Sequence, residues 1–329
     1  MKKILSIVLA LVLVLGLCAV ASAEFKFERK ITIVCPWGVG GGADSTIRPM
    51  ANLLQEYLGV PVEVQNVEGG SGVNGVEYTL KQPADGYTFM LGTQSLYLQD
   101  MMGNISVDFK TEMKPIDVLV HSINFIVGSK VNMEKYGVKS WTDLQKYIAD
   151  HPFEVSVAML TATGVDGASL AQATEGLDLL ELPYDSGSDA NSALVGGHVD
   201  LYVCGYDEIA GLVESGDIIP MLALCENRLK VLPDLECSAE VGVNSFMAPW
   251  RAVFAKKDTP QEAVDTLVAA IEACRSNETW QNFLKDGAYD ERPVPTVEEL
   301  PAFAQAEYKA LRDYMQEQGT LVKDYEDLK

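Results

Sequence analysis

Side chains that perform acid–base or metal chemistry are scarce in this sequence. Its 329 residues include three histidines, which lie far apart in the chain at His121, His151 and His198. None of the six cysteines belongs to a C-x-x-C pair, a typical spacing of zinc ligands. The sequence also has no Walker lysine and no G-x-S-x-G elbow. We therefore expect no metal, no cofactor and no catalytic nucleophile.

Positive charge is scarce as well. Lysine and arginine number 25 against 47 acidic residues, and the formal net charge at pH 7 is −22. Nucleic acids and anionic lipids are bound by clustered basic residues, which this balance disfavours. The acidity itself suits a soluble protein. We expect neither nucleic acid nor an anionic membrane surface as a partner.

Only one long apolar run is present, and it lies at the start of the chain. Two lysines precede apolar residues 4–20, and residues 21–23 have the sequence Ala-Ser-Ala. This order is typical of a secretory signal peptide, with cleavage after Ala23. A membrane anchor and a lipid attached to Cys18 are the alternatives. We expect an exported chain that begins at residue 24 and works in the periplasm or at the extracellular face.

Cleavage there leaves an odd number of cysteines, namely Cys35, Cys204, Cys225, Cys237 and Cys274. An odd number cannot pair completely within one chain. An exported protein meets an oxidising compartment, which permits a bridge between Cys225 and Cys237. Buried free thiols are the alternative, and the sequence leaves both open.

Strand and helix patterns alternate along the rest of the chain. Residues 31–34 form a β-branched run, and apolar residues then recur at helical spacing up to Leu58. Asp44 is the expected N-cap of this helix, and Gly59 its expected end. Repeated β-α-β units predict mainly parallel sheets with helices on both faces.

Two glycine-rich loops follow predicted strands, PWGVGGGAD at 36–44 and GGSGVNG at 69–75. Glycine lets the backbone approach a ligand closely, and a helix start offers N–H groups and partial positive charge. In a parallel sheet both loops lie at the carboxyl ends of strands, where ligands bind. The loops predict an anion site that needs no lysine or arginine. Tight turns without a ligand are the alternative.

The first loop also fits the dinucleotide fingerprint G-x-G-x-x-A, at residues 38–43. However, Pro36 and Trp37 separate the glycines from the strand. The next predicted strand ends in Gln65-Asn66 instead of the acid that would bind ribose. The sequence therefore disfavours a bound dinucleotide.

An ordered set of motifs resembles the solute receptors of tripartite tricarboxylate transporters, often called Bug receptors. Each motif alone is weak, but together they cover nearly the whole chain after the signal peptide. They are residues 36–44, Arg48, 59–62, Asn66, 69–75, 85–88, 92–93, 183–184, 196–200, 232–234, Glu240, Gly242, Trp250 and 259–260.

The resemblance implies an α/β protein with a two-lobed periplasmic-binding-protein fold, type II-like, in which each lobe is a mainly parallel sheet flanked by helices. We expect lobe 1 to combine residues 24–121 and 248–329, and lobe 2 to span 122–247. The resemblance implies a receptor and not an enzyme. It would capture a small carboxylate, such as a di- or tricarboxylate, an amino acid or an aromatic acid. Its partner would be a membrane permease with a large and a small subunit, and we expect a monomer.

By position, the resemblance implies ligand-binding residues in both lobes, and it leaves Asp44 as a cap. The ligand-binding set is Trp37, Gly40, Gly41, Ala43, Ser71, Gly72, Thr93, Thr161, Thr163 and Asp185.

The chain departs from the family pattern by carrying extra acids, Asp166, Asp185 and Asp189. In the cleft these acids would repel a tricarboxylate and suit a ligand that carries an amine. Exposure to solvent is the alternative for all three.

Two other functions stay open. A secreted α/β enzyme acting on a small anion would need a nucleophile–base pair or a metal. A sensory receptor would bind the same solute and signal to a membrane kinase, and a neighbouring permease gene would argue against it.

Overall fold

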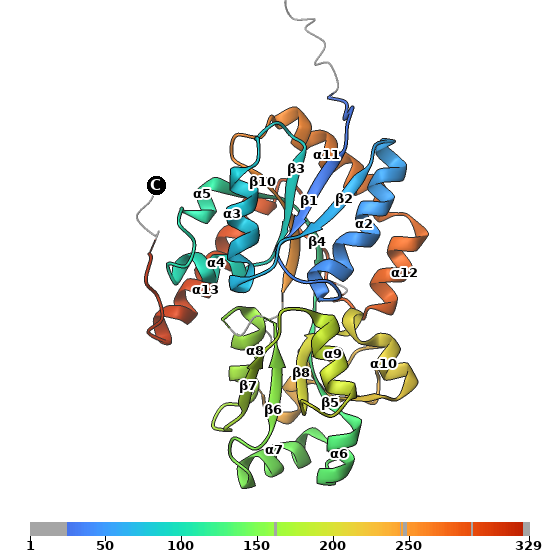
Figure 1. Cartoon of the computed structure of the whole chain (residues 1–329), viewed down its shortest axis with the longest axis vertical. Helices are drawn as coiled ribbons and strands as arrows, with labels where there is room; N and C mark the ends of the chain where they lie inside the picture. The colour runs from blue at the N-terminus through green and yellow to red at the C-terminus, as the bar shows by residue number, and fades with distance from the viewer. Residues whose placement is uncertain (1–24, 161–162, 244, 246–248, 291, 325–329) are drawn as a thin grey trace, which may run out of the picture.

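The computed structural model describes residues 25–160, 163–243, 245, 249–290 and 292–324. Two five-stranded sheets form separate lobes in this part of the chain (Figure 1). The first sheet has the order β2-β1-β3-β10-β4, formed by Val62–Asn66, Ile31–Cys35, Thr88–Gly92, Trp250–Lys256 and Met113–His121. The second has the order β7-β6-β8-β5-β9, formed by Leu180–Pro183, Ser156–Met159, Leu201–Gly205, Asn124–Ser129 and Ile218–Leu224.

Each sheet has four strands in one direction and one strand opposed. In the first sheet β1 is parallel to β2 and β3, while β10 is antiparallel to both β3 and β4. In the second sheet β6 is parallel to β7 and β8, while β5 is antiparallel to β8 and β9. The prediction of two lobes with mainly parallel sheets is confirmed.

The opposed strand of each sheet directly follows a passage between the lobes. The chain leaves the first sheet at His121 and enters the second at Asn124. It leaves the second sheet at Leu224 and re-enters the first at Trp250. The expected lobe boundaries at 121/122 and 247/248 stay a prediction, and residues 247 and 248 lie outside the described part of the chain.

Helices cover both sheets. In Figure 1, α2 and α12 lie on one side of the first sheet, and α3, α4 and α13 lie on the other. The helices of the first lobe are α2 (Gly42–Leu58), α3 (Val73–Lys81), α4 (Ser95–Met101), α5 (Phe109–Glu112), α11 (Gln261–Arg275), α12 (Glu278–Asp286) and α13 (Leu300–Glu317). Those of the second lobe are α6 (Lys130–Tyr136), α7 (Trp141–Asp150), α8 (Val165–Ala173), α9 (Gly187–Val195) and α10 (Ala210–Ser215). Within residues 25–324, no described helix is long and apolar enough to span a bilayer.

Short 3-10 turns join several of these elements, namely η1 (Gly70–Gly72), η2 (Tyr206–Glu208) and η3 (Ser238–Val241). The second sheet is buried on both faces. Successive side chains of a strand point to opposite sides, so neighbouring residues show what covers each face. Ile126 of β5 packs into one apolar cluster, while its neighbours Phe125 and Val127 pack into the other.

The five cysteines after residue 24 are free thiols, and Cys225 and Cys237 are among them.

Helix α2 ends where the sequence predicts but begins earlier. Gly59 adopts a left-handed conformation with φ 69°, and its N–H bonds to the carbonyl of Gln55. The N-cap is Gly41, so the expectation that Asp44 caps the helix is wrong. Asp44 lies in the first turn, where its carboxylate accepts bonds from Arg48 and Asn66. A negative charge in the first turn is still stabilised by the positive end of the helix dipole.

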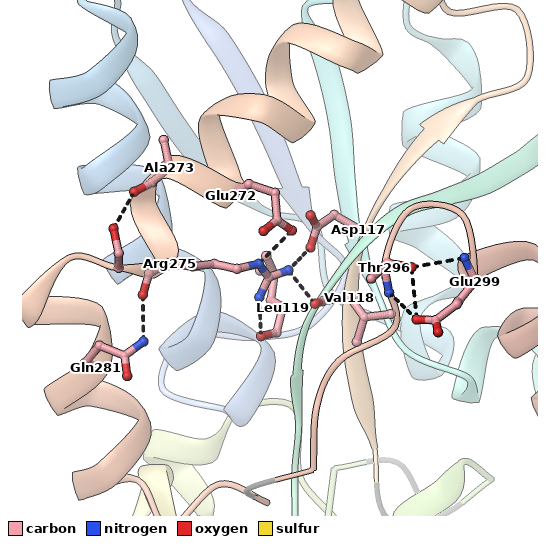
Figure 2. Close-up of polar contacts among 10 residues, drawn as sticks. Asp117, Val118, Leu119, Glu272, Ala273, Arg275, Gln281, Thr296 and Glu299 are labelled. Atoms are coloured by element: carbon pink, nitrogen blue, oxygen red, sulfur yellow. Dashed lines mark hydrogen bonds and ion pairs between the residues drawn. The ribbon is translucent and has the colours of Figure 1, made fainter.

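Arg275 at the end of α11 holds the edge strand β4 (Figure 2). Its guanidinium donates to the carbonyls of Val118 at 2.8 Å and Leu119 at 3.3 Å, and it pairs with Asp117. Burial raises the pKa of the Asp117 carboxyl to about 7, although the Arg275 charge lowers it. Because these carbonyls belong to an edge strand, Arg275 satisfies groups that another chain would otherwise pair with.

Asp200 organises the second lobe in a comparable way. One of its oxygens accepts from Asn132 Nδ2 and Tyr136 Oη, both at 2.8 Å. The other accepts from the N–H and the hydroxyl of Ser156, at 2.8 and 2.7 Å. Four donors thus converge on one buried carboxylate, which ties β8 to β6 and α6.

Asp200→Asn should lower the free energy of unfolding by about 3 kcal/mol. The NH₂ group of the asparagine would face donors that now bond to a carboxylate oxygen, and the remaining bonds would lose their charge assistance. Urea unfolding would measure this change. Asp178→Asn is the matched control, since Asp178 is exposed in the same lobe. Equal stability of the two variants would contradict the role assigned to Asp200.

Candidate functional site

A small cavity lies between the two lobes. It has a volume of about 40 Å³, which is room for water molecules but not for an organic acid. Its walls come from both lobes, mostly from residues just beyond the carboxyl ends of β1, β3, β6 and β8. The lining residues are Trp37, Gly41, Gly42, Ala43, Thr93, Ser95, Asn124, Leu160, Asp166, Glu208, Pro249 and Arg251.

The first glycine loop forms one wall of the cavity. It brings Trp37 and the start of α2 to the lining, and no side chain caps the helix at Gly41. Trp37 is 9 % exposed, and its indole nitrogen has no acceptor among the described residues. The helix start thus lines the cavity, and its N–H groups and the buried indole N–H are donors that an acceptor would satisfy.

Arg251 of β10 supplies the positive charge of the cavity. The side chain is buried, and its guanidinium donates to Thr46 Oγ1 at 3.0 Å and to the Tyr289 hydroxyl at 3.2 Å. Its ion-pair partner is Asp207 of the second lobe, with 3.5 Å between Nη1 and Oδ2. A Cβ on Gly42 would lie 1.8 Å from Arg251 Nη2. The first residue of α2 must therefore be glycine for the guanidinium to fit.

Two acids of the second lobe complete the lining. Glu208, at the end of η2, accepts from the Tyr202 hydroxyl at 2.8 Å and from the Gly205 N–H at 3.0 Å. Asp166, in the first turn of α8, accepts from Asn124 Nδ2 at 3.0 Å. Arg251 therefore faces acids across the boundary between the lobes.

Burial shifts the pKa values of these charges. Withdrawal from water, followed by the charge of Asp207, raises the pKa of Glu208 from 4.5 to about 8. Burial also raises the pKa of Asp207, although Arg251 lowers it. Burial lowers the pKa of Arg251, but the combined attraction of Asp207 and the surrounding groups Tyr289, Glu208 and Asp166 outweighs burial and keeps the guanidinium charged.

Direct contacts hold the two lobes together around the cavity. The Ser188 hydroxyl donates to the carbonyl of Val39 at 3.2 Å. Gln99 Nε2 donates to the carbonyl of Thr163 at 2.9 Å. The N–H of Val165 donates to the Ser95 hydroxyl at 3.0 Å. The lobes are thus closed on each other, and a solute requires them to separate.

Four of the residues expected to bind ligand line this cavity, namely Trp37, Gly41, Ala43 and Thr93. Gly40 lies against the other lobe: its φ is +79°, and a Cβ there would lie 2.4 Å from Ser188 Oγ. Gly72 supports the wall from behind, because a Cβ on it would contact Leu96 and Trp37.

The remaining expected residues are outside the lining. The hydroxyls of Ser71 and Thr163 bond to each other across the lobes at 3.1 Å. Asp185 is exposed, and its backbone carbonyl, not its carboxylate, approaches Gly38. Thr161 lies outside the described residues.

The extra acids of the second lobe have different positions. Asp166 lines the cavity, whereas Asp189 is exposed and accepts a bond from the Ser186 hydroxyl. Arg251, Asp207 and Glu208 were not expected at the site. Two signals were available for them: a cation inside an apolar strand, and an Asp-Glu pair just after another strand.

The described residues contain no cluster of three or more His, Cys, Asp or Glu side chains placed to hold a metal ion. Two lobes joined by two passages, with a lined cavity between them, define the class of two-lobed solute-binding receptors. Residues 46–322 match the model of the tripartite tricarboxylate transporter family receptor. The chain belongs to this family of receptors.

Relatives agree with this assignment. Protein BugT of Bordetella pertussis is 28 % identical over 331 residues, covering 98 % of this chain and 99 % of BugT. The structure of the periplasmic binding protein BugD superposes with a TM-score of 0.82 at 24 % identity, over 90 % of this chain and 100 % of BugD. An R. palustris protein solved with adipate gives a TM-score of 0.80 at 25 % identity, over 89 % of this chain and 98 % of that protein.

The pKa of Glu208 makes closure without solute depend on pH. Asp207, Tyr202 and Gly205 belong to the same lobe and stay beside Glu208 when the lobes separate, but separation would expose the carboxyl, and burial raises its pKa by more than the Arg251 charge lowers it. Separation should therefore lower a pKa that closure raises to about 8, so closure takes up a proton and the closed fraction should fall as pH rises toward about 8. The radius of gyration from small-angle X-ray scattering would follow this change. Glu208→Gln should reduce the pH dependence, and a closed fraction that grows with pH would contradict the assignment.

Proposed function

We propose that this receptor is exported, closes on a small carboxylate in the cavity between its lobes, and delivers it to a membrane permease with a large and a small subunit. One observation carries the proposal: the uncapped start of α2 and the guanidinium of Arg251 converge on one point of the cavity wall. A helix start offers N–H donors and partial positive charge to an anion, and arginine forms strong charge-assisted hydrogen bonds to carboxylate.

The chemistry of the wall supports a carboxylate ligand. The N–H groups at the start of α2 offer donors and the positive end of a 17-residue helix dipole. The buried indole N–H of Trp37 offers a further donor. The R. palustris relative that was solved with adipate, a dicarboxylate, also supports this class of ligand.

Closure is part of the proposed mechanism. A cavity of about 40 Å³ requires the solute to enter between separated lobes and to keep them further apart when they close. The two passages near residues 121–124 and 224–250 would act as the hinge. The closed, liganded surface is then what the permease recognises, and we retain the expected lobe boundaries for this motion.

Export rests on the sequence and the family. The proposed signal peptide, residues 1–23, lies outside the described residues. The family is named for a transporter, which fits a receptor that works outside the cytoplasmic membrane.

We also propose that the protein has no enzymatic activity. The described residues that line the cavity include no histidine and no cysteine. The Ser95 hydroxyl accepts from the Val165 N–H, which gives it a structural role between the lobes. Nucleophilic catalysis needs a nucleophile within hydrogen-bond reach of a base, which this lining does not provide.

The processed chain, secreted by a bacterial host, should bind at least one small carboxylate. Thermal-shift screening of mono-, di- and tricarboxylates would find it, since a ligand that binds only the native state raises the melting temperature. Native mass spectrometry of the freshly purified chain would identify a co-purified acid. The proposal fails if no carboxylate in the screen shifts the melting temperature and none co-purifies.

Gly187→Ala should block closure and weaken solute binding by on the order of tenfold or more. A Cβ on Gly187 would lie 2.4 Å from the Gly40 carbonyl oxygen of the other lobe. Gly211→Ala is the matched control, because no atom lies within 4 Å of its added Cβ. Both alanines are in helices of the second lobe, so both variants should fold. Calorimetry would compare their affinities, and equal affinities would exclude closure at this contact.

A further inference from the structure

The cavity has two walls of opposite charge. The first lobe contributes Arg251 and the start of α2, which is the positive end of the helix dipole. The second lobe contributes Asp166 and Glu208. A site built in this way fits a solute that carries both charges better than a dianion.

Acids outnumber cations around the cavity. Arg251 is the only basic residue among the described residues of the lining, and it already forms an ion pair with Asp207. Asp166 and Glu208 bring two further carboxyl groups to the lining, and burial together with the charge of Asp207 raises the pKa of Glu208 to about 8. A second carboxylate on the solute would approach this group of acids, and those that are ionised would repel it strongly in a site withdrawn from water.

Glu208 is well placed to accept bonds from a solute. The Tyr202 hydroxyl and the Gly205 N–H hold it in position. These bonds occupy two of the about four acceptor positions of a carboxylate. Burial and the charge of Asp207 disfavour its ionised form. A positive group beside Glu208 would favour that ionised form again.

We propose that the solute is a zwitterion of the amino-acid class. Its carboxylate binds the start of α2 and the Trp37 indole N–H, and its ammonium group lies against Glu208 and Asp166. This inference rests on the proposed function, because it assigns the chemical class of the solute in the same cavity.

Matched pairs of acids test this assignment. Aspartate and succinate, glutamate and glutarate, alanine and propionate, and leucine and 4-methylpentanoate each differ only by the α-ammonium group. Calorimetry on the full processed chain should show at least one amino acid binding about tenfold or more tightly than its partner, which is the effect of a hydrogen bond to a charged group.

Glu208→Gln and Asp166→Asn identify the acceptors. Each should lower the preference for that amino acid by about tenfold, because binding of the amino acid weakens while binding of its deaminated partner does not. Two variants are needed because Glu208 also accepts bonds from Tyr202 and Gly205, so its replacement alters the second lobe as well as the contact with the solute. Asp178→Asn and Glu214→Gln are the controls, since both residues are exposed in the same lobe.

The outcomes separate this inference from the proposed function. Deaminated acids that bind as tightly as the amino acids in every pair would overturn the zwitterion and leave the carboxylate receptor in place. A preference that survives in both variants would overturn the assignment to Glu208 and Asp166. Failure of every carboxylate to bind, with or without an amine, would overturn the proposed function itself.

Discussion

Arg251 is a buried charge whose ion-pair partner, Asp207, lies in the other lobe. Thr46 and Tyr289 of its own lobe bond to the guanidinium, but they carry no charge that balances it. Leaving a buried cation unpaired costs several kcal/mol. Separation of the lobes therefore requires water or a solute to replace Asp207. The relative position of the lobes depends on what satisfies this one side chain.

Local sequence patterns predicted much of the fold. The end of α2 at Gly59 follows from a short-range rule that the structure obeys. The prediction that Asp44 caps α2 was wrong. The helix begins at Gly42, and the Asp44 carboxylate accepts bonds from Arg48 and Asn66 within the first turn. The opposed strands β5 and β10 each lie between two partners distant in sequence, and pairing of that kind has no local signature.

The site could be predicted only in part, and for a physical reason. Trp37, Ala43 and other loop residues follow a strand and open a helix, so their pattern alone indicates the cavity. Arg251 and Glu208 meet only after both lobes have folded and closed. Acidity alone was a poor guide, because Asp166 lines the cavity while Asp189 is exposed. Sequence composition does not say which way a side chain points.

The close approach of backbone across the lobes has a consequence for how this sequence can change. A Cβ on Gly187 would lie 2.4 Å from the Gly40 carbonyl oxygen, and a Cβ on Gly40 would lie 2.4 Å from Ser188 Oγ. A larger side chain at either position would leave each sheet and its core intact and would alter only how the lobes meet. The first glycine loop is therefore constrained by the opposite lobe as well as by any solute. A new solute preference would arise more readily at a lining position such as Asp166 than within this loop.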